Sequence, residues 1–360
     1  MRREDPLILG AGPAGCAAGI ALARGGAKPL LVDRDPLVAD ALCGGFLSWR
    51  TAGRLRALGV DAEGLGAHPV ERLILYGQGR PAEIALPNRA FALSRRVLDT
   101  ALRQRAVAEG AELIHDTVRQ VEGVQVTGRA HSWQADSLFL ATGKHDLRGT
   151  TRPRPAKDPA LGLRVRMTPS PGLARRLAHT IELHLFDGGY AGVVLQEDGS
   201  ANVCLAVRKS LMGEAAADPV RLLAQLAAKH AHFALRLEPG WHDLRIDCIG
   251  SIPYGWSAQA TEPGVFRLGD QAAVIPSLAG EGIDIALASG IAAAEAWLAG
   301  GSGAAPAYQQ DLYKRVKSPL LWAAVAWGLA ERPAISKWGL AAARFAPKLV
   351  ERWVDATRLD

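Results

Sequence analysis

The chain has 360 residues, 49% of them hydrophobic and 22% charged, with a net charge of +6 and a pI of about 9.3. This length is enough for a large core in two lobes, and the composition is that of a soluble globular protein. Most arginines are dispersed, and no stripe alternates them with aromatic residues. We therefore expect no nucleic-acid partner.

The ends of the chain and its cysteines favour a cytoplasmic protein. Met1 to Asp5 lead directly into the first predicted strand, without a signal peptide. The longest apolar run, residues 319–330, is too short to span a bilayer. The four cysteines are scattered without the spacing of metal ligands, so we expect neither a metal site nor a disulfide framework: Cys16, Cys43, Cys204 and Cys248.

A glycine turn follows the first predicted strand, residues 7–9. Gly10, Gly12 and Gly15 have the G-x-G-x-x-G spacing of a dinucleotide-binding turn. Gly10 permits the turn, Gly12 lets a pyrophosphate approach the backbone, and Gly15 lets the next helix pack close to the sheet. The N–H groups at the start of that helix, residues 14–24, would meet the phosphates.

An acidic residue ends the second predicted strand, residues 29–32. Asp33 stands near the spacing of about 20 residues at which an acid accepts hydrogen bonds from an adenosine ribose. Its charge would repel a 2′-phosphate, so the site suits an unphosphorylated adenosine. This motif does not distinguish NAD from FAD.

The middle of the chain predicts a helix and then a second sheet. Ser94 is a plausible N-cap for a helix over 94–109, whose apolar residues fall on one face. Another strand, 137–140, ends at Ala141-Thr142-Gly143. From about 151 to 260 hydrophobic residues alternate with period two, which is typical of an antiparallel sheet.

A second glycine-rich segment lies near the end of the chain. Gly269-Asp270 ends a predicted strand, and Asp270 is placed to accept hydrogen bonds from hydroxyls such as those of a ribityl chain. The loop from Pro276 leads through Gly280-Glu281-Gly282-Ile283 into a helix whose N-terminus would stabilise negative charge on a reduced flavin ring. The two segments together indicate one flavin bound by both ends of the chain.

The chain resembles the FAD-dependent flavoproteins of the aromatic-hydroxylase fold, and within them the geranylgeranyl reductase-like branch. The resemblance spans roughly residues 5–300. The residues that carry it are the two glycine segments with Asp33, the stretch 43–48 (Cys-Gly-Gly-Phe-Leu-Ser), Arg95 before Leu98-Asp99, and Ser289-Gly290.

This resemblance implies FAD as the cofactor. Pyrophosphate contacts are implied at Gly12 and Gly15, with Arg95 near the phosphates. Asp33 would bind the adenosine ribose, and Asp270 the ribityl or pyrophosphate part. Pro276 and the stretch 280–283 would surround the isoalloxazine. The expected contacts extend to Gly10, Pro13, Ala14, Arg34, Cys43, Gly44, Val118, Thr142, Gly143 and Gly269.

Three departures from related families narrow the chemistry. Thr142 stands where the hydroxylases carry the acid of an Asp-Gly motif, which puts direct use of NADPH in doubt and leaves NAD(P)H and a separate reductant open as electron donors. The Trp-x-Trp-x-Ile-Pro motif of flavin halogenases is absent, and residues 190–193 fill its place. A second Gly-x-Gly-x-x-Gly turn, which a separate nicotinamide domain would need, is also absent.

Three residues are candidates for a role in the reaction. Cys43, in its glycine-rich loop, is either a proton donor or gate, or a small buried thiol. Lys144 and His145 follow the middle strand and offer charge or proton transfer. Tyr190 and Trp256 are candidate lining residues of the substrate cavity.

The tail from 308 to 360 reads as mostly helical and mixes tryptophans with basic residues. It fits a lid over an apolar substrate, a surface resting on anionic lipid, or a plain helical cap. Its residues are Trp322, Trp327, Trp338 and Trp353 with Lys314, Arg315, Lys317, Lys337, Arg344, Lys348 and Arg352.

The sequence thus predicts an α/β protein: a Rossmann-like, three-layer ββα FAD-binding domain (1–70, 90–150 and 261–300), an antiparallel-sheet substrate domain (71–89 and 151–260) and a helical C-terminal cap (301–360). We expect an FAD-dependent oxidoreductase acting on a hydrophobic small molecule, an isoprenoid, polyketide or lipid-like compound. Hydride transfer to a C=C bond and hydroxylation both remain open, as does a non-catalytic flavin-binding partner. An NAD-dependent dehydrogenase would explain only the first glycine turn. Peripheral membrane contact fits the basic tail; the sequence leaves the oligomeric state open.

Overall fold

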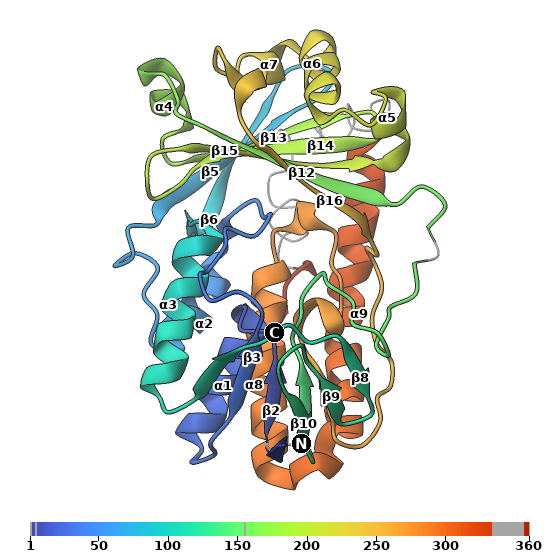
Figure 1. The fold of residues 1–360 in the computed structure, drawn as a ribbon. Coiled ribbons are helices and arrows are strands. Elements are labelled where there is room, and N and C mark those ends of the chain that lie inside the picture. Colours follow the sequence, from blue (N-terminus) through green and yellow to red (C-terminus); the bar gives the residue numbers. More distant parts are fainter. Residues whose placement is uncertain (1, 4–5, 155, 333–355, 360) are drawn as a thin grey trace.

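The computed structural model describes residues 2–3, 6–154, 156–332 and 356–359. These residues form two lobes (Figure 1). The lower lobe holds a five-stranded and a four-stranded sheet with helices, and the upper lobe is built on one eight-stranded sheet. Helix α9 (Ala305–Ala330) runs along both lobes.

The five-stranded sheet is parallel throughout, in the order β17-β11-β2-β3-β7. Its strands are short and buried, which suits a sheet covered on both faces. Their bounds are β2 Leu7–Leu9, β3 Leu30–Asp33, β7 Glu112–His115, β11 Leu138–Leu140 and β17 Val265–Arg267.

Alternate residues of these strands enter two separate cores. Ile8, Leu31 and Phe139 pack with the helices, whereas Leu7 and Leu9 pack with the small four-stranded sheet. The three-layer ββα arrangement predicted from the sequence is therefore confirmed. The small sheet has the order β1-β10-β9-β8, with bounds Arg2–Arg3, Ser132–Gln134, Gln125–Thr127 and Gln120–Glu122.

Four helices cover the other face of the parallel sheet. The predicted helix over 94–109 is confirmed: Ser94 Oγ accepts a hydrogen bond from the Val97 N–H at 3.2 Å and caps its first turn. Ser48 caps α2 in the same way, through the Thr51 N–H. The helices are α1 Pro13–Arg24, α2 Trp49–Ala57, α3 Arg95–Ala108 and α8 Gly282–Gly300.

Glycines bring α1 and α8 into direct backbone contact. A Cβ at Gly290 of α8 would collide with the carbonyl oxygen of Ala14 in α1, so only glycine fits there. A Cβ at Gly15 would likewise collide with the carbonyl oxygen of Gly10. Gly15 thus allows the close packing that the sequence predicted. Gly290 does the same between the helices, so the N-termini of α1 and α8 are fixed relative to each other.

The upper sheet joins two distant parts of the chain, in the order β16-β12-β15-β14-β13-β5-β6-β4. The sequence predicted an antiparallel sheet, and six of its pairings are antiparallel, but β13 and β5 pair in parallel. The strands are β4 Phe46–Leu47, β5 His68–Tyr76, β6 Ala82–Ala92, β12 Ala160–Met167, β13 Thr180–Phe186, β14 Gly189–Leu195, β15 Ala201–Arg208 and β16 Ile246–Ile252.

Short helices cover the outer face of the upper sheet (Figure 1). A buried polar cluster lies there: Arg236 donates to both carboxylate oxygens of Glu182, at 2.6 and 2.7 Å, and to the Tyr76 hydroxyl at 2.7 Å. Alternation along β13 turns Glu182 to this face and Ile181 to the opposite one. The helices are α4 Pro171–Leu177, α5 Lys209–Glu214, α6 Pro219–Lys229 and α7 Ala231–Ala234.

The first part of the predicted C-terminal cap is α9, which is fixed to both lobes. The Tyr308 hydroxyl bonds to the Arg267 carbonyl at 2.9 Å, and Glu331 pairs with Arg208 of the upper lobe at 2.7 Å. Trp322 and Trp327 lie on α9. The predicted tail residues Lys337, Trp338, Arg344, Lys348, Arg352 and Trp353 lie outside the described residues.

Among the described residues, one helical stretch, 282–330, is long and apolar enough to cross a membrane, and half of its apolar window is buried in the protein. Its first helix, α8, packs against α1 in the core. Burial of this kind is typical of a core helix, which passes the same test of length and composition.

Candidate FAD and substrate site

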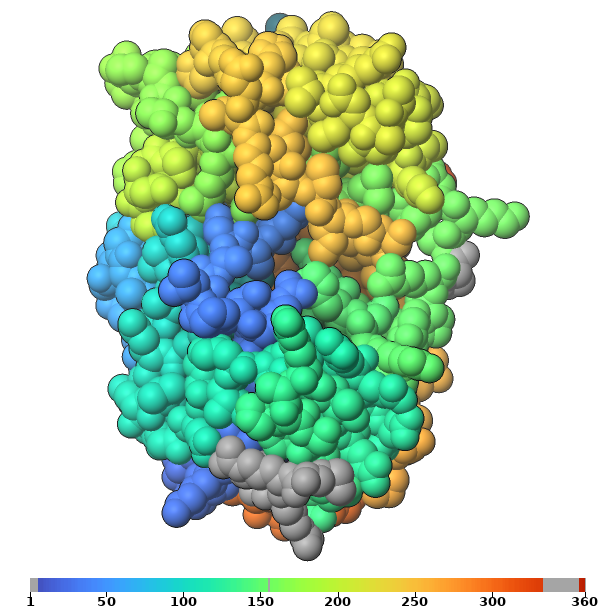
Figure 2. All heavy atoms as spheres, in the orientation of Figure 1, coloured from blue at the N-terminus to red at the C-terminus, as the bar shows by residue number. Residues whose placement is uncertain are grey.

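One cavity of ≈ 1360 Å³ lies between the two lobes, at the carboxyl ends of the parallel strands. Ligands bind at this edge in open α/β sheets. The volume exceeds the range of about 300–1,000 Å³ that a single small ligand occupies. A recess between the lobes is visible on the surface (Figure 2). The cavity therefore has room for a cofactor and a second molecule.

The structure brings both glycine segments to this one cavity. Gly12 and Asp270, from opposite ends of the chain, both line it. Other predicted residues that line it are Gly10, Pro13, Ala14, Asp33, Arg34, Cys43, Gly44, Arg95, Val118, Thr142, Gly143, Lys144, His145, Gly269, Gly280, Gly282 and Ile283. Gly15, Pro276 and Glu281 do not line it: Gly15 packs against the strand instead.

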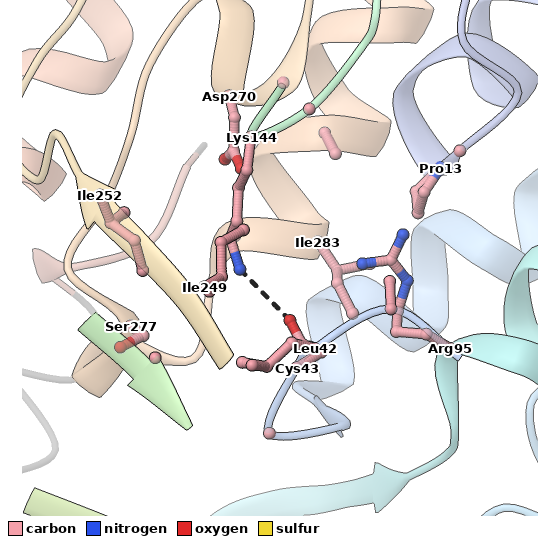
Figure 3. A pocket seen from close by; sticks show the side chains of 18 of the residues that line it. Pro13, Leu42, Cys43, Arg95, Lys144, Ile249, Ile252, Asp270, Ser277 and Ile283 are labelled. Atoms are coloured by element: carbon pink, nitrogen blue, oxygen red, sulfur yellow. Dashed lines mark hydrogen bonds between the residues drawn. The ribbon is translucent and has the colours of Figure 1, made fainter. Parts of the chain in front are cut away.

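The turn before α1 is open toward the cavity. A Cβ at Gly12 would meet only Arg95 Nη2, at 3.8 Å, and no side chain caps this helix. Arg95 is held by Asp99 through two bonds of 2.8 and 2.7 Å and lies near Pro13 in Figure 3. Free helix N–H groups beside an oriented guanidinium fit a pyrophosphate.

Asp33 is fixed at the end of β3 by three donors. Its carboxylate accepts from the Ala11 N–H at 2.7 Å, the Asp35 N–H at 3.0 Å and Arg103 at 2.9 Å. A carboxylate offers about four acceptor positions, so one remains for a ribose hydroxyl. Arg103 lies on α3 eight residues after Arg95, and the sequence analysis did not single it out.

The second glycine segment is tied to the loop after β11. Arg152 is only 2% exposed. Its guanidinium donates to the Asp270 carbonyl at 2.6 Å and forms an ion pair with Asp146 at 2.6 Å. Gln271 donates to the Gly143 carbonyl at 2.9 Å. These bonds hold Asp270 at the cavity wall. Arg152 was missed because a single arginine in a loop carries no sequence pattern.

Lys144 and His145 contact the loop after β3, in the half of the cavity that the glycine segments line. Lys144 Nζ donates to the Leu42 carbonyl at 3.2 Å, as Figure 3 shows, and Arg34 contacts His145 Nε2 at 3.3 Å. Burial, and then the positive charge of Arg34, lower the pKa of His145. Both influences favour the neutral form of His145. Both residues connect the loop after β3 with the loop after β11; their participation in the reaction stays a prediction.

Cys43 sits in the loop between the two halves of the cavity. Its sulfur accepts from the Gly45 N–H at 3.4 Å, and its carbonyl accepts from Asn202 at 3.2 Å. A Cβ at the neighbouring Gly44 would meet nothing within 4 Å, so the backbone is open to a ligand there. The position agrees with contact to a cofactor ring and a substrate.

The N-terminus of α8 carries a buried carboxyl group outside the cavity. Burial raises the pKa of Glu281 to about 7, against the effect of Arg358, whose guanidinium lies 3.6 Å away. Leu359 docks beside it, and its carbonyl accepts from Arg50 and Arg54 at 3.0 and 3.2 Å. The end of the chain thus supports the loop that was predicted to surround the isoalloxazine.

The half of the cavity under the upper sheet is apolar. Its floor consists of inward-facing residues of the strands, including Leu75, Ile181, Leu183 and Val194. Gly192 leaves a gap in this floor, because a Cβ there would have only ordinary contacts, the nearest 3.5 Å away. On α9, Trp322, Val325 and Leu329 line one side. Tyr190 also lines it, as predicted, whereas Trp256 is not among the lining residues.

Comparison with known protein families identifies the cofactor. The family described as FAD binding domain matches residues 3–146. This range contains the glycine turn, Asp33 and Arg95, whose open backbone and oriented charges fit FAD. The predicted cofactor is therefore confirmed.

Curated relatives match most of the chain. The menaquinone reductase of Mycolicibacterium smegmatis is 28% identical over 340 residues, covering 87% of this chain and 82% of the relative. Digeranylgeranylglycerophospholipid reductase 2 of Methanopyrus kandleri is 26% identical over 313 residues, covering 81% and 76%.

Solved structures share the fold along nearly the whole chain. The flavin-dependent brominase Bmp2 superposes with a TM-score of 0.75 at 16% identity, over 99% of this chain and 94% of its own. A geranylgeranyl bacteriochlorophyll reductase-like protein of Thermoplasma acidophilum gives 0.70 at 20% identity, over 99% and 100%.

Fold, site and relatives together define an FAD-dependent oxidoreductase, either a reductase or a monooxygenase, with the fold of the aromatic hydroxylases. Its relatives include geranylgeranyl reductase-like proteins, as the resemblance of the sequence implied.

Proposed function

We propose that the protein is a reductase that saturates a C=C bond in the polyprenyl chain of a lipid-like substrate. The observation that carries this proposal is the apolar half of the cavity, which adjoins the FAD half without a separating wall. The names of the two curated relatives support it, since both describe reductases and both substrates named there are lipids.

When bound, reduced FAD would supply the hydride for one carbon of the double bond, and a proton from water would complete the other. The floor strands would orient the apolar chain of the substrate and exclude water, and Arg95 with the start of α1 would hold the pyrophosphate of FAD. The N-terminus of α8 favours negative charge near the loop 280–283. We propose that a separate reductant, rather than bound NAD(P)H, supplies the electrons, because Thr142 replaces the usual acid.

An anaerobic single turnover tests this function. Holoenzyme reduced with dithionite is mixed with menaquinone without oxygen, and the product is re-oxidised in air before mass spectrometry. A reduced naphthoquinone ring returns to the quinone in air, whereas a saturated side chain keeps two added hydrogen atoms. A product identical to the starting menaquinone, together with an equally unchanged geranylgeraniol in a parallel reaction, would refute the proposal.

The second candidate is a monooxygenase, which the shared fold favours through neighbours such as the brominase. It requires oxygen and adds an oxygen atom to the substrate, so the anaerobic reaction would give no product. Oxygen consumption that depends on substrate, measured with an electrode, distinguishes the two. The non-catalytic alternative predicts no cavity beside the flavin, and the adjoining apolar half speaks against it.

We also propose that the protein meets its substrate at a lipid surface while remaining cytoplasmic. Four apolar side chains on α9 are exposed, Leu321 by 61%, Trp322 by 44%, Val325 by 43% and Leu329 by 44%, and the last three also line the cavity. Co-sedimentation with phosphatidylglycerol vesicles is expected, with weaker binding after Leu321→Ser. Equal recovery in the supernatant with and without vesicles would contradict this.

A further inference from the structure

Three hydroxyl groups meet in the apolar half of the cavity. Tyr190 comes from β14, Tyr254 follows β16, and Ser277 begins the short helical turn Ser277–Ala279 before α8. All three line the cavity. Ser277 is exposed into it, and Figure 3 shows it in the same region as Ile249 and Ile252.

The hydroxyls form one connected chain centred on Ser277. The Tyr190 hydroxyl donates to Ser277 Oγ at 2.9 Å, and the Tyr254 hydroxyl lies 2.6 Å from the same atom. The geometry allows either partner of the second bond to donate. Ser277 therefore connects two tyrosines that come from different strands.

The three linked hydroxyl groups have one donor proton that their mutual hydrogen bonds do not use. Three hydroxyls carry three protons, and the two hydrogen bonds between them use two. Because Tyr190 donates to Ser277, the third proton belongs to Tyr254 or to Ser277. A polar group facing an apolar cavity is stabilised by a hydrogen-bond partner. An acceptor atom on a bound molecule would complete the chain.

Packing fixes the rings that carry the hydroxyls. Trp327 of α9 contacts both of them, with ring centroids 5.8 Å from Tyr190 and 5.6 Å from Tyr254. Aromatic pairs at this separation and tilt are favourable. The hydroxyl chain is thus held in one place relative to the cavity before a ligand arrives.

The surroundings favour an uncharged ligand atom. Burial is the main influence that raises the pKa of both tyrosines, so they stay protonated donors. The ionisable groups that influence these pKa values include the two tyrosines themselves, Cys43, Cys204 and Asp270. Moving a phosphate or carboxylate from water to this apolar floor would cost more free energy than moving an uncharged oxygen.

We propose that the Tyr190–Ser277–Tyr254 hydroxyl chain anchors an uncharged oxygen of the substrate, a carbonyl or hydroxyl group, while the apolar floor holds its hydrocarbon part. The proposal deepens the function proposed above by naming the polar feature of the substrate. A lipid quinone has such an oxygen, whereas the phosphate of a phospholipid would have to lie elsewhere.

A binding experiment with the oxidised holoenzyme tests the anchor without turnover. The probes are menadione and 2-methylnaphthalene, which share a ring system but differ in two carbonyl oxygens, and dissociation constants come from changes in the flavin absorption spectrum. The test variant is Tyr190→Phe/Ser277→Ala/Tyr254→Phe, which removes every hydroxyl and keeps both rings on Trp327. Tyr313→Phe, on α9 outside the cavity-lining residues, is the control.

The variant is expected to bind menadione about 3- to 10-fold more weakly, the effect of one hydrogen bond, with affinity for 2-methylnaphthalene and FAD content unchanged. Equal changes for both probes, or no change for either, would overturn the anchor. The result of this binding experiment is independent of the anaerobic single-turnover test. Selective menadione binding without side-chain saturation would support the hydroxyl anchor and contradict the proposed reaction.

Discussion

Arg95 and Gly12 are neighbours in the wall of the cofactor half of the cavity, with Arg95 Nη2 3.8 Å from the place where a Cβ of Gly12 would stand. Asp99 fixes the guanidinium from behind through two hydrogen bonds. The positive side chain therefore lies beside the free N–H groups at the start of α1, and both border the open cavity, an arrangement that suits a pyrophosphate.

A side chain at Gly12, which would project into the cavity beside Arg95, is expected to abolish FAD retention while leaving the fold intact. Gly12→Val places a branched side chain in space that the protein does not use but the cofactor does. The purified variant should lack the flavin absorption bands of the wild type and show the same far-UV circular dichroism. Gly53→Ala, in α2 where a Cβ meets nothing within 4 Å, is the control. A yellow Gly12→Val protein would contradict the assigned contact.

Glu182→Gln is expected to lower the free energy of unfolding by about 3 kcal/mol at pH 7, because it leaves the buried Arg236 without its counter-charge. Hydrogen bonds from His184 and Arg236 outweigh burial and lower the pKa of Glu182 to about 2. A lowered carboxyl pKa stabilises the fold above the unfolded value near 4.5, and this contribution is lost as the pH falls toward 2.

Urea unfolding of the FAD-saturated proteins at a series of pH values measures this difference. The gap between wild type and Glu182→Gln should narrow below about pH 4.5. Glu83→Gln breaks an exposed pair with Arg72 and should change stability by less than about 1 kcal/mol. Equal losses of unfolding free energy in Glu182→Gln and Glu83→Gln would contradict a stabilising role for the buried Glu182–Arg236 pair.

Glu281 should make the stability fall as the pH rises through 7. Burial raises its pKa from 4.5 to about 7, so the folded protein favours the protonated form. A raised carboxyl pKa stabilises the fold below pH 4.5, and the contribution decreases as the pH rises toward and through 7. Between pH 5 and 7 the wild type should lose up to about 1.4 kcal/mol per pH unit relative to Glu281→Gln.

Thermal or urea unfolding of the wild type and of Glu281→Gln from pH 5 to 8 gives the slope of unfolding free energy against pH for each protein. Asp198, an exposed carboxyl group beside Arg166, offers Asp198→Asn as a control whose slope should match the wild type in this range. Parallel curves for wild type and Glu281→Gln would show that Glu281 is already ionised at pH 5.

Gly192→Phe is expected to block the substrate half of the cavity and leave FAD in place. Its strand is regular and its φ is not positive, so a large residue meets no backbone strain there. The phenyl ring would occupy the floor between Leu183 and Cys204. Turnover of a polyprenyl substrate should fall at least tenfold, with flavin content unchanged, whereas Gly192→Ala should retain activity. Full activity in Gly192→Phe would show that the substrate lies elsewhere.

The cofactor half of the site was largely predictable, because its requirements are local. The glycine spacing, Asp33 and the Ser94 cap each leave a short sequence pattern, and the structure brings their residues to one cavity or one helix end. Arg103 could have been found from its spacing of eight residues after Arg95 on the same helix. No local sequence pattern points to Arg152, because it acts from a loop.

The substrate half was less predictable, because it depends on pairing between remote segments. The parallel pairing of β13 with β5 leaves no periodic signal in either strand. Tyr190, Tyr254 and Ser277 come from three elements and meet only once the upper sheet is placed over the loop before α8. The bonds from Lys144 to Leu42 and from Arg34 to His145 likewise join loops that are distant in sequence.

The glycine contact between α1 and α8 has a mechanical consequence. At Gly290 the backbone of α8 meets the backbone of α1 directly, so we expect the two helices to resist sliding or separating. We therefore expect any motion that admits the proposed substrate to lie in the loops around the opening or in α9, with the starts of α1 and α8 at a constant distance from each other.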